Sequence, residues 1–222
     1  TGVQTCALPI YTGTGTSWYD LSSNKLTFTS GGTQTPYSTV NNVKCFNFNS
    51  SGYWTCGTGY SAVDMGGDCT LIMMLYDIGH ATRRTVFEKA GTVAASYQQE
   101  IACTWEPAPS MSYYSRQTPS YDYAGTAALP TNSWFMLGIK MSTGKSTTAR
   151  SGYYSINGVP WTSSYTSNSN TALTPAGAIQ VGTGYAGTCD SGYVGAILCY
   201  NKMLSDAELA QNYHALRGRF GI

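Results

Sequence analysis

The C-terminal segment of this chain has the pattern of a buried strand followed by a turn and a capped helix. Apolar side chains fill both alternating sets of positions in residues 193–200, which is typical of a strand covered on both faces. Ser205 is a predicted N-cap, and Glu208 three residues later completes a capping box. Leu204 and Leu209 flank this cap as a hydrophobic staple. One short helix at the end of a strand-rich chain restricts the fold sharply.

The predicted helix has one apolar face. Leu209, Tyr213 and Leu216 recur at helical spacing, so we expect them to pack against the rest of the protein. Gly218 is the predicted C-terminal stop.

Short strand-like segments separated by turn residues fill most of the chain. Asn157 and Gly158 lie between two alternating runs and predict a type I′ hairpin. Regularly spaced strands of this kind favour a sandwich or jelly roll. We predict strands at residues 43–48, 69–76, 86–89, 134–141, 153–156 and 179–181, besides 193–200.

Three motifs resemble laminin-G-like, concanavalin A-like domains. The C-terminal block carries the main resemblance, with Tyr200–Asn201, Leu204–Glu208 and Asn212–Tyr213. Trp18–Ser22 and Tyr154–Val159 match upstream family segments in the same order. The resemblance covers about residues 17–220 and implies an all-β, concanavalin A-like jelly-roll sandwich of two antiparallel sheets with one short C-terminal helix. Within it, we expect Trp18 to be buried and Asp20 to bond backbone amides.

Residues 1–10 lie outside this resemblance. They resemble the translation of a common short-read sequencing adapter, which predicts an artefactual leader and a sequence of metagenomic origin. The alternative is a real, short apolar lead-in. We expect a single sandwich domain over residues 11–222.

The chain is polar but carries little charge. Charged residues make up 10%, against roughly 25% in an average soluble domain, and the formal net charge is +1. This composition argues against nucleic-acid binding, and no apolar run approaches the roughly 20 residues of a membrane span. It favours an extracellular protein, or one at a particle surface.

Seven cysteines are present, and one of them, Cys6, lies in the suspected leader. An even set of six in an oxidising compartment favours three disulfides, with buried thiols as the alternative. Their spacing does not match a zinc site. The six disulfide candidates are Cys45, Cys56, Cys69, Cys103, Cys189 and Cys199.

The segment 104–132 is the least regular, with four prolines and several aromatic residues, and we predict a functional loop there. Aromatic rings beside polar groups suit sugars, because a pyranose stacks on a ring while its hydroxyls bond to amides and carboxylates. Packing of these rings against the sandwich is the alternative. The glycan-binding candidates are Trp105, Tyr113, Tyr114, Tyr121, Asp122 and Tyr123.

Neither catalysis nor a cofactor is expected. The closely spaced glutamates of retaining polysaccharide hydrolases are absent, and His80 beside Arg83 and Arg84 is the one weak cluster for a lyase. Asp64 and Asp68 are weak calcium candidates, since two carboxylates fall short of six to eight oxygens. The residues favour a non-catalytic, lectin-like glycan-recognition module. The alternative is a structural or decoration subunit that self-associates in a virion, appendage or matrix; a polysaccharide-cleaving enzyme is a minority alternative.

Overall fold

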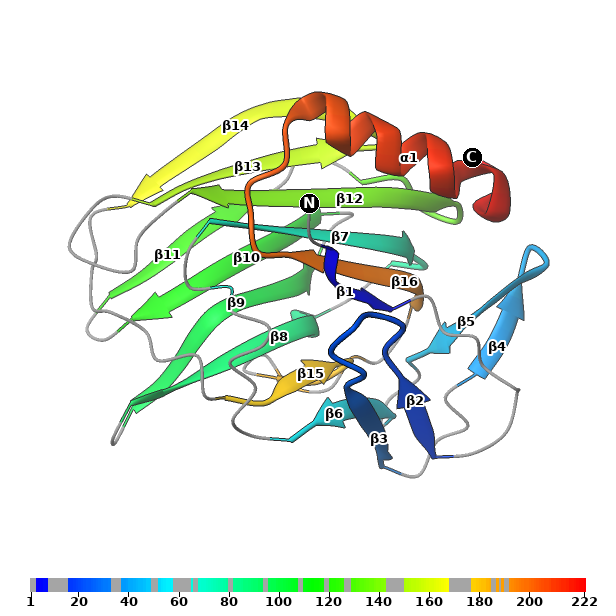
Figure 1. Cartoon of the computed structure of the whole chain (residues 1–222), viewed down its shortest axis with the longest axis horizontal. Helices are drawn as coiled ribbons and strands as arrows, with labels where there is room; N and C mark the ends of the chain where they lie inside the picture. Colours follow the sequence, from blue (N-terminus) through cyan, green and yellow to red (C-terminus); the bar gives the residue numbers. More distant parts are fainter. Residues whose placement is uncertain are drawn as a thin grey trace.

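The computed structural model describes residues 3–7, 16–32, 37–48, 52–57, 65, 68–79, 82–93, 96–107, 110–117, 120–125, 129–142, 150–167, 177–184, 187, 189 and 192–222. These residues form two antiparallel sheets and a C-terminal helix, α1 (Asp206–Phe220) (Figure 1). The predicted all-β sandwich with a C-terminal helix is therefore confirmed. No helix of the described residues is long and apolar enough to cross a membrane.

The first sheet, sheet A, has the strand order β14-β13-β12-β7-β16-β5-β4, and β1 also pairs with β16. Its strands are β1 (Val3–Ala7), β4 (Tyr37–Val40), β5 (Val43–Asn47), β7 (Cys69–Tyr76), β12 (Trp134–Ser142), β13 (Arg150–Ile156), β14 (Val159–Ser167) and β16 (Tyr193–Tyr200). Strand β1 lies inside the suspected leader and pairs with Ile197–Tyr200 of β16. The proposed boundary at residue 11 stays a prediction.

The second sheet, sheet B, has the strand order β11-β10-β9-β8-β15-β6-β3-β2. Its strands are β2 (Ser17–Tyr19), β3 (Thr27–Gly31), β6 (Tyr53–Cys56), β8 (Arg84–Val93), β9 (Ser96–Glu106), β10 (Ser110–Gln117), β11 (Ser120–Gly125) and β15 (Ile179–Val181).

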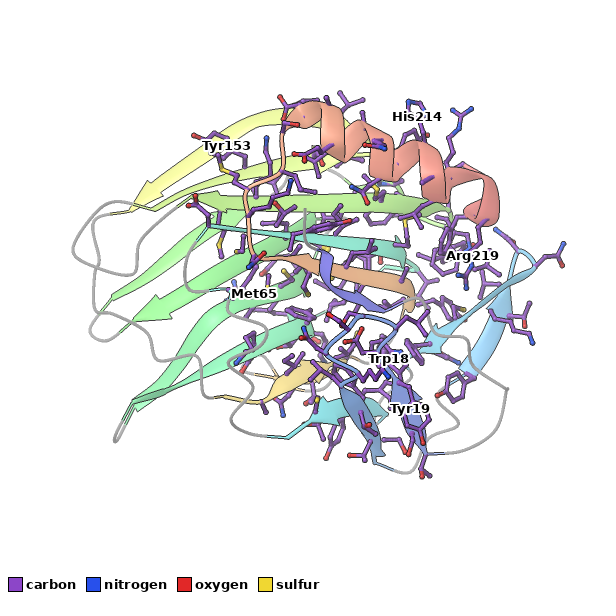
Figure 2. The ribbon with its side chains drawn as sticks, viewed as in Figure 1. Trp18, Tyr19, Met65, Tyr153, His214 and Arg219 are labelled. Carbon is purple, nitrogen blue, oxygen red and sulfur yellow. The ribbon has the colours of Figure 1, made fainter. Side chains whose placement is uncertain are left out.

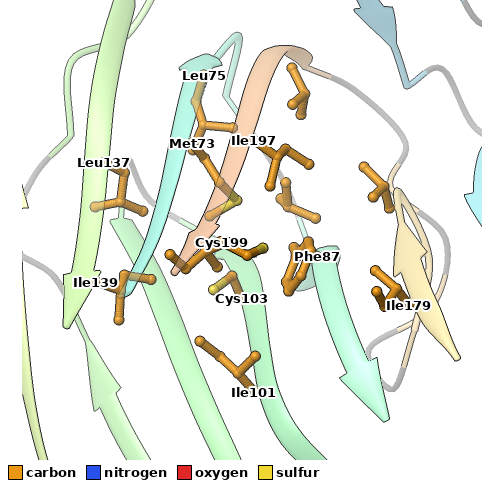
Figure 3. Close-up of a cluster of buried hydrophobic side chains, with 14 of the residues drawn as sticks. Met73, Leu75, Phe87, Ile101, Cys103, Leu137, Ile139, Ile179, Ile197 and Cys199 are labelled. Carbon is orange, nitrogen blue, oxygen red and sulfur yellow. The ribbon is translucent and has the colours of Figure 1, made fainter. Parts of the chain in front are cut away.

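The main core lies between the two sheets. Alternate residues of β7 and β12 point inward from sheet A (Figure 3). From sheet B they meet alternate residues of β9 and β15, together with Val86 and Phe87 of β8, where a bulge interrupts the alternation. At the β2–β6 end this core is aromatic: Trp54 packs 5.3 Å from Phe46 and 6.2 Å from Trp18 between ring centroids. The predicted apolar face of residues 134–141 is part of this core.

A second apolar layer lies on the outer face of sheet A, under α1. The other alternate residues of β7, β12 and β16, including Ile72, Met136 and Leu198, pack there against Leu209 and Phe220 of the helix. Figure 1 shows α1 beside β12 and β13. Burial of each such side chain contributes roughly 1.5–3 kcal/mol, so this layer explains why the strands of sheet A are apolar on both faces.

Helix α1 begins where the sequence predicts and ends later. Ser205 is the N-cap, and the capping box with Glu208 is present. The predicted stop at Gly218 is wrong, because the helix continues to Phe220 and Gly221 forms a left-handed cap with φ 68°. Phe220 packs on Trp134 at 5.0 Å between ring centroids, and this tertiary contact extends the helix beyond its local stop signal.

The predicted hairpin at Asn157 and Gly158 is confirmed, with φ angles of 52° and 76°. The Asn157 side-chain oxygen accepts from the Met136 backbone N–H at 2.8 Å, and the Asn157 N–H donates to the Met136 carbonyl at 2.9 Å. A Cβ on Gly158 would lie 3.0 Å from Tyr213 of α1, so the turn also fits under the helix.

The prediction of an irregular loop at 104–132 is wrong over most of its length. This segment contains the end of β9 and the strands β10 and β11, which pair as a meander. Of the prolines that suggested a loop, Pro107 and Pro130 fall outside the strand bounds, and Pro109 and Pro119 lie outside the described residues. A proline between strands ends one strand without preventing the next.

The disulfide prediction is also wrong for this structure, in which all six candidate cysteines are buried thiols. Cys45 lies in the layer between sheet A and α1, whereas Cys56 lies in the core between the sheets. Cys45 and Cys56 are near in sequence but do not pair, because the two side chains belong to different layers. Cys69, Cys103, Cys189 and Cys199 are all in the core between the sheets.

Candidate functional site

One row of paired residues crosses every strand of sheet B. Each residue of this row is the register partner of the next, and we call it the outer row. Its members, from β2 to β11, are Ser17, Thr29, Thr55, Gln180, Glu88, Ala102, Tyr114 and Tyr123. For the strands in the middle of the sheet, the adjacent residues Trp54, Val181, Phe87 and Cys103 are buried in the core. Successive side chains alternate between faces, so Thr55, Gln180 and Glu88 lie on the outer face of sheet B.

At the β2–β6 end, the outer row is flanked by residues of the same kind. We call this surface the uncharged face. It consists of Ser17, Tyr19, Thr27, Thr29, Tyr53, Thr55 and Gln180, which present hydroxyls, an amide and two phenol rings. Tyr19 is 63% exposed, and Thr27 and Thr29 are exposed as well. In the described part of the chain no helix covers this face, in contrast to sheet A.

Tyr53 adopts a specific position on the uncharged face. Its register partner on β3 is Gly31, and a Cβ placed on Gly31 would lie only 2.2 Å from Cζ of the Tyr53 ring. The ring therefore extends from β6 across β3 and occupies the space that a side chain at Gly31 would need. Because Gly31 has no side chain, the Tyr53 ring can lie against the sheet at this position.

The underside of this surface is rigidly packed. Trp18 is 2% exposed and stacks on Phe28 at 4.3 Å between ring centroids, so β2 and β3 are fixed against the core. Trp18 and Tyr19 are neighbours on β2, with Trp18 buried and Tyr19 exposed (Figure 2). Asp20 then accepts from the Ser22 backbone N–H at 2.9 Å, and the Asp20 N–H donates to the Leu26 carbonyl at 2.8 Å. The predicted structural roles of Trp18 and Asp20 are confirmed.

The middle of the outer row is covered. Glu88 is fully buried, and a Cβ placed on Gly184 would lie 2.3 Å from its Oε2, so the chain after β15 passes close over this carboxylate. Further along β9, Glu106 accepts from Arg83 Nε at 2.9 Å and from Thr104 Oγ1 at 3.0 Å. These bonds occupy the Glu106 carboxylate and hold β9 against the segment before β8.

The two glutamates do not form a glycosidase pair. Glu88 is the register partner of Ala102, and Glu106 lies four residues further along β9. At about 3.3 Å per residue along the strand and about 4.8 Å between strands, the two backbone positions are about 14 Å apart. Glu88 is buried, and the Glu106 carboxylate is bonded to Arg83 and Thr104, so the two carboxylates do not face each other across an open site as those of a glycosidase do.

Trp105 is not available to a ligand, so its place among the glycan-binding candidates was wrong. It is 1% exposed and packs edge-on against Phe135 at 6.3 Å between ring centroids. The physical reason is alternation along β9, which directs Cys103 and Trp105 into the core.

The remaining glycan-binding candidates lie on β10 and β11. Tyr114 pairs with Tyr123 at the far end of the outer row. Tyr113 pairs with Ala124, Ser115 with Asp122, and Arg116 with Tyr121. The side chains of these candidates lie outside what the structure describes, so their contact with sugar stays a prediction.

The structure describes only some of the weak metal and lyase candidates. Asp64 and His80 lie outside the described residues, and Asp68 is exposed just before β7. Arg83 bonds to Glu106. Within the described ranges, no group of three His, Cys, Asp or Glu side chains could hold a metal ion.

Sequence reasoning missed the uncharged face. Its signal is the alternation of polar with large apolar residues in Ser17–Tyr19, Thr27–Ser30 and Tyr53–Cys56. Each of these runs is short, and only the pairing of β2, β3 and β6 places their polar residues side by side.

The fold resembles parts of several larger solved proteins. Trypanosoma rangeli sialidase in complex with sialic acid matches with a TM-score of 0.69 and 12% identity, over 99% of this chain and 34% of the sialidase. The binding domain of botulinum neurotoxin DC in complex with rat synaptotagmin II matches with a TM-score of 0.69 and 10% identity, over 97% of this chain and 52% of that one. The receptor-binding domain of botulinum neurotoxin type G gives a TM-score of 0.66 at 10% identity, over 95% and 50%.

What these proteins share with this chain is the fold. It is a β-sandwich of two antiparallel sheets. The chain spans only a third to a half of the matched proteins. No protein-family model and no curated protein sequence matches it.

Proposed function

We propose that this protein is a non-catalytic glycan-recognition domain that binds through the outer face of sheet B. The observation that carries the proposal is the uncharged face, where two tyrosine rings lie among hydroxyl and amide groups. Sugars need this chemistry, because their C–H faces stack on aromatic rings and their hydroxyls both donate and accept hydrogen bonds.

The matched proteins support a recognition role without defining a ligand. One of them is in complex with sialic acid and another with rat synaptotagmin II, and the matched region is about a third of the first and half of the second. We propose further that the chain is laminin-G-like and works extracellularly or at a particle surface. The C-terminal strand–turn–helix motif and the 10% content of charged residues support this.

Absence of catalysis is part of the proposal. It is supported by the burial of Glu88 and by the bonds that tie the Glu106 carboxylate to Arg83 and Thr104.

Self-association in a larger assembly is the second candidate function. The same surface favours it, because cores of protein interfaces are rich in tyrosine and poor in charge. In this case the uncharged face would contact another copy of the chain instead of a glycan.

A glycan-array screen of the full chain tests the proposal, run with calcium and again with chelator. Thr29→Arg places a long charged side chain on the uncharged face, and Val159→Arg places one at an exposed position of sheet A as a control. We expect binding to one class of sugar that Thr29→Arg abolishes and Val159→Arg preserves.

Absence of any glycan binding by folded protein would overturn the proposal. Concentration-dependent assembly, measured by sedimentation and lost in Thr29→Arg, would then identify the self-association function. Loss of glycan binding in chelator would show that a metal participates.

A further inference from the structure

We infer that Tyr53, lying over Gly31, is a stacking subsite for one ring of a neutral oligosaccharide that runs across β3, β6 and β15. This inference rests on the proposed function and adds the place of contact and the class of sugar. Apart from Gly31, which lies under the ring, it uses only residues of the uncharged face.

The first step is the orientation of the ring. Cζ, Cε2 and the hydroxyl oxygen of Tyr53 would lie 2.2, 2.4 and 2.5 Å from a Cβ on Gly31. Neighbouring strands are about 4.8 Å apart, so the ring bridges the gap between β6 and β3 close above the backbone. A ring in this position has one face toward the sheet and the other toward solvent. Tyr53 is accordingly half-buried.

The second step is the set of polar groups beside the ring. Thr55 and Thr29 lie two residues along β6 and β3 from Tyr53 and Gly31, about 7 Å away. Gln180 is the next partner of Thr55 in the outer row. Hydroxyl and amide groups both donate and accept, so they match the hydroxyls of a sugar adjacent to the stacked ring.

The third step is charge. The described side chains of the uncharged face include no arginine or lysine, which would be needed to pair with the carboxylate of an acidic sugar. The face therefore offers no cationic partner to an anionic ligand and favours a neutral one.

The fourth step is length. From Ser17 through Thr29 and Thr55 to Gln180, the row crosses three gaps between strands, about 14 Å in all. This length exceeds that of a single pyranose ring. The geometry therefore points to a short stretch of a sugar chain lying across the strands.

The test is isothermal titration of the full chain with neutral and acidic probes. The neutral probes are cellohexaose, laminarihexaose, mannohexaose and xylohexaose, and the acidic ones are hexagalacturonate and sialyllactose. We expect a neutral hexaose to bind and the acidic sugars to fail. Tyr53→Ala should weaken binding about tenfold or more, and Tyr53→Phe should preserve it, because stacking needs the ring and not its hydroxyl.

Two further variants keep the test decisive. Gly31→Ala should also weaken binding, since its Cβ displaces the Tyr53 ring. If Tyr53→Ala does not fold, Gly31→Ala decides the outcome. Tyr153→Ala, at a tyrosine of sheet A that is 37% exposed, is the matched control and should bind as the wild type does.

The outcomes separate the two proposals. Glycan binding that is unchanged in Tyr53→Ala and Gly31→Ala, or binding of acidic sugars alone, overturns the stacking subsite and leaves the glycan-binding function standing. No binding of any sugar by folded protein overturns both.

Discussion

Two glycines, one in each sheet, lie under aromatic rings and have opposite consequences. On sheet A, a Cβ on Gly195 would lie 2.2 Å from the Phe220 ring of α1. On sheet B, a Cβ on Gly31 would lie 2.2 Å from the Tyr53 ring. Phe220 is 2% exposed and anchors the helix, whereas Tyr53 keeps part of its side chain exposed. The same local arrangement thus closes one face and leaves the other accessible.

The residues around each glycine account for the difference. The neighbours of Phe220 on sheet A are large and apolar, including Trp134, Met136 and Leu198, so a helix must cover them. The neighbours of Tyr53 are the threonines Thr29 and Thr55, whose hydroxyls hydrogen-bond to water, so no element has to cover them. A ring over a glycine is therefore a structural anchor in an apolar surround and a candidate binding platform in a polar one.

The largest expected effect is on the covered face. Phe220→Ala should lower the free energy of unfolding by about 3–5 kcal/mol, because it removes the ring that packs on Trp134 and Gly195. Tyr19→Ala, at a residue 63% exposed on the other sheet, should change it by less than about 0.5 kcal/mol. Urea unfolding followed by tryptophan fluorescence measures both. Equal losses would contradict the contrast between the two faces.

The two glycines give the direct comparison. Gly195→Ala should cost about 1–3 kcal/mol, since Phe220 is held by its neighbours and cannot move aside. Gly31→Ala should cost less than Gly195→Ala, because the end of the Tyr53 side chain can swing into solvent. Thermal melts of the two variants, made side by side, provide the check, and the reverse order would show that Tyr53 is an anchor too.

A smaller effect concerns the start of the covering helix. The bond from Lys202, followed by those from the Ser205 backbone and side chain, lowers the pKa of Glu208 from 4.5 to about 2. The stabilisation by ionised Glu208 is present above pH 4.5 and is lost as the pH falls toward 2. Glu208→Gln should therefore flatten the decline in stability between pH 4.5 and 2, as measured by urea unfolding across that range. Lys202→Ala should reduce the decline in part, and a slope unchanged in both variants would exclude this role for the cap.

The smallest effect is on chemical reactivity and leaves stability unchanged. Burial raises the pKa of Cys45, under α1, to about 12, and raises the pKa of Cys103, between the sheets, well above its usual value of 9.0. Both thiols stay protonated at pH 8, so iodoacetamide should label them only after denaturation, as mapped by mass spectrometry. Labelling of Cys45 before Cys103 at low urea would show that the helix layer opens ahead of the sandwich. Rapid labelling of either in native protein would contradict their burial.

Local patterns in the sequence were sufficient for several features. The Ser205–Glu208 capping box and the Asn157–Gly158 turn depend on residues close in sequence, so they could be recognised directly. The strands at Cys69–Tyr76 and Tyr193–Tyr200 were predictable because a doubly buried strand is apolar throughout. These features together determined the sandwich and its C-terminal helix.

Features that depend on distant pairing needed the tertiary structure. Trp105 looked like a ligand contact until the alternation of β9 placed it in the core. Cys45 and Cys56 are near in sequence, yet they lie in different layers. The stacking subsite at Tyr53 depends on the register between β6 and β3, which places Gly31 under the ring. The sequence alone determined where the helix begins and which strongly apolar segments are strands. The register between strands far apart in the chain decided which side chains meet on the candidate face, because a shift of one residue would turn each of them to the other side of the sheet.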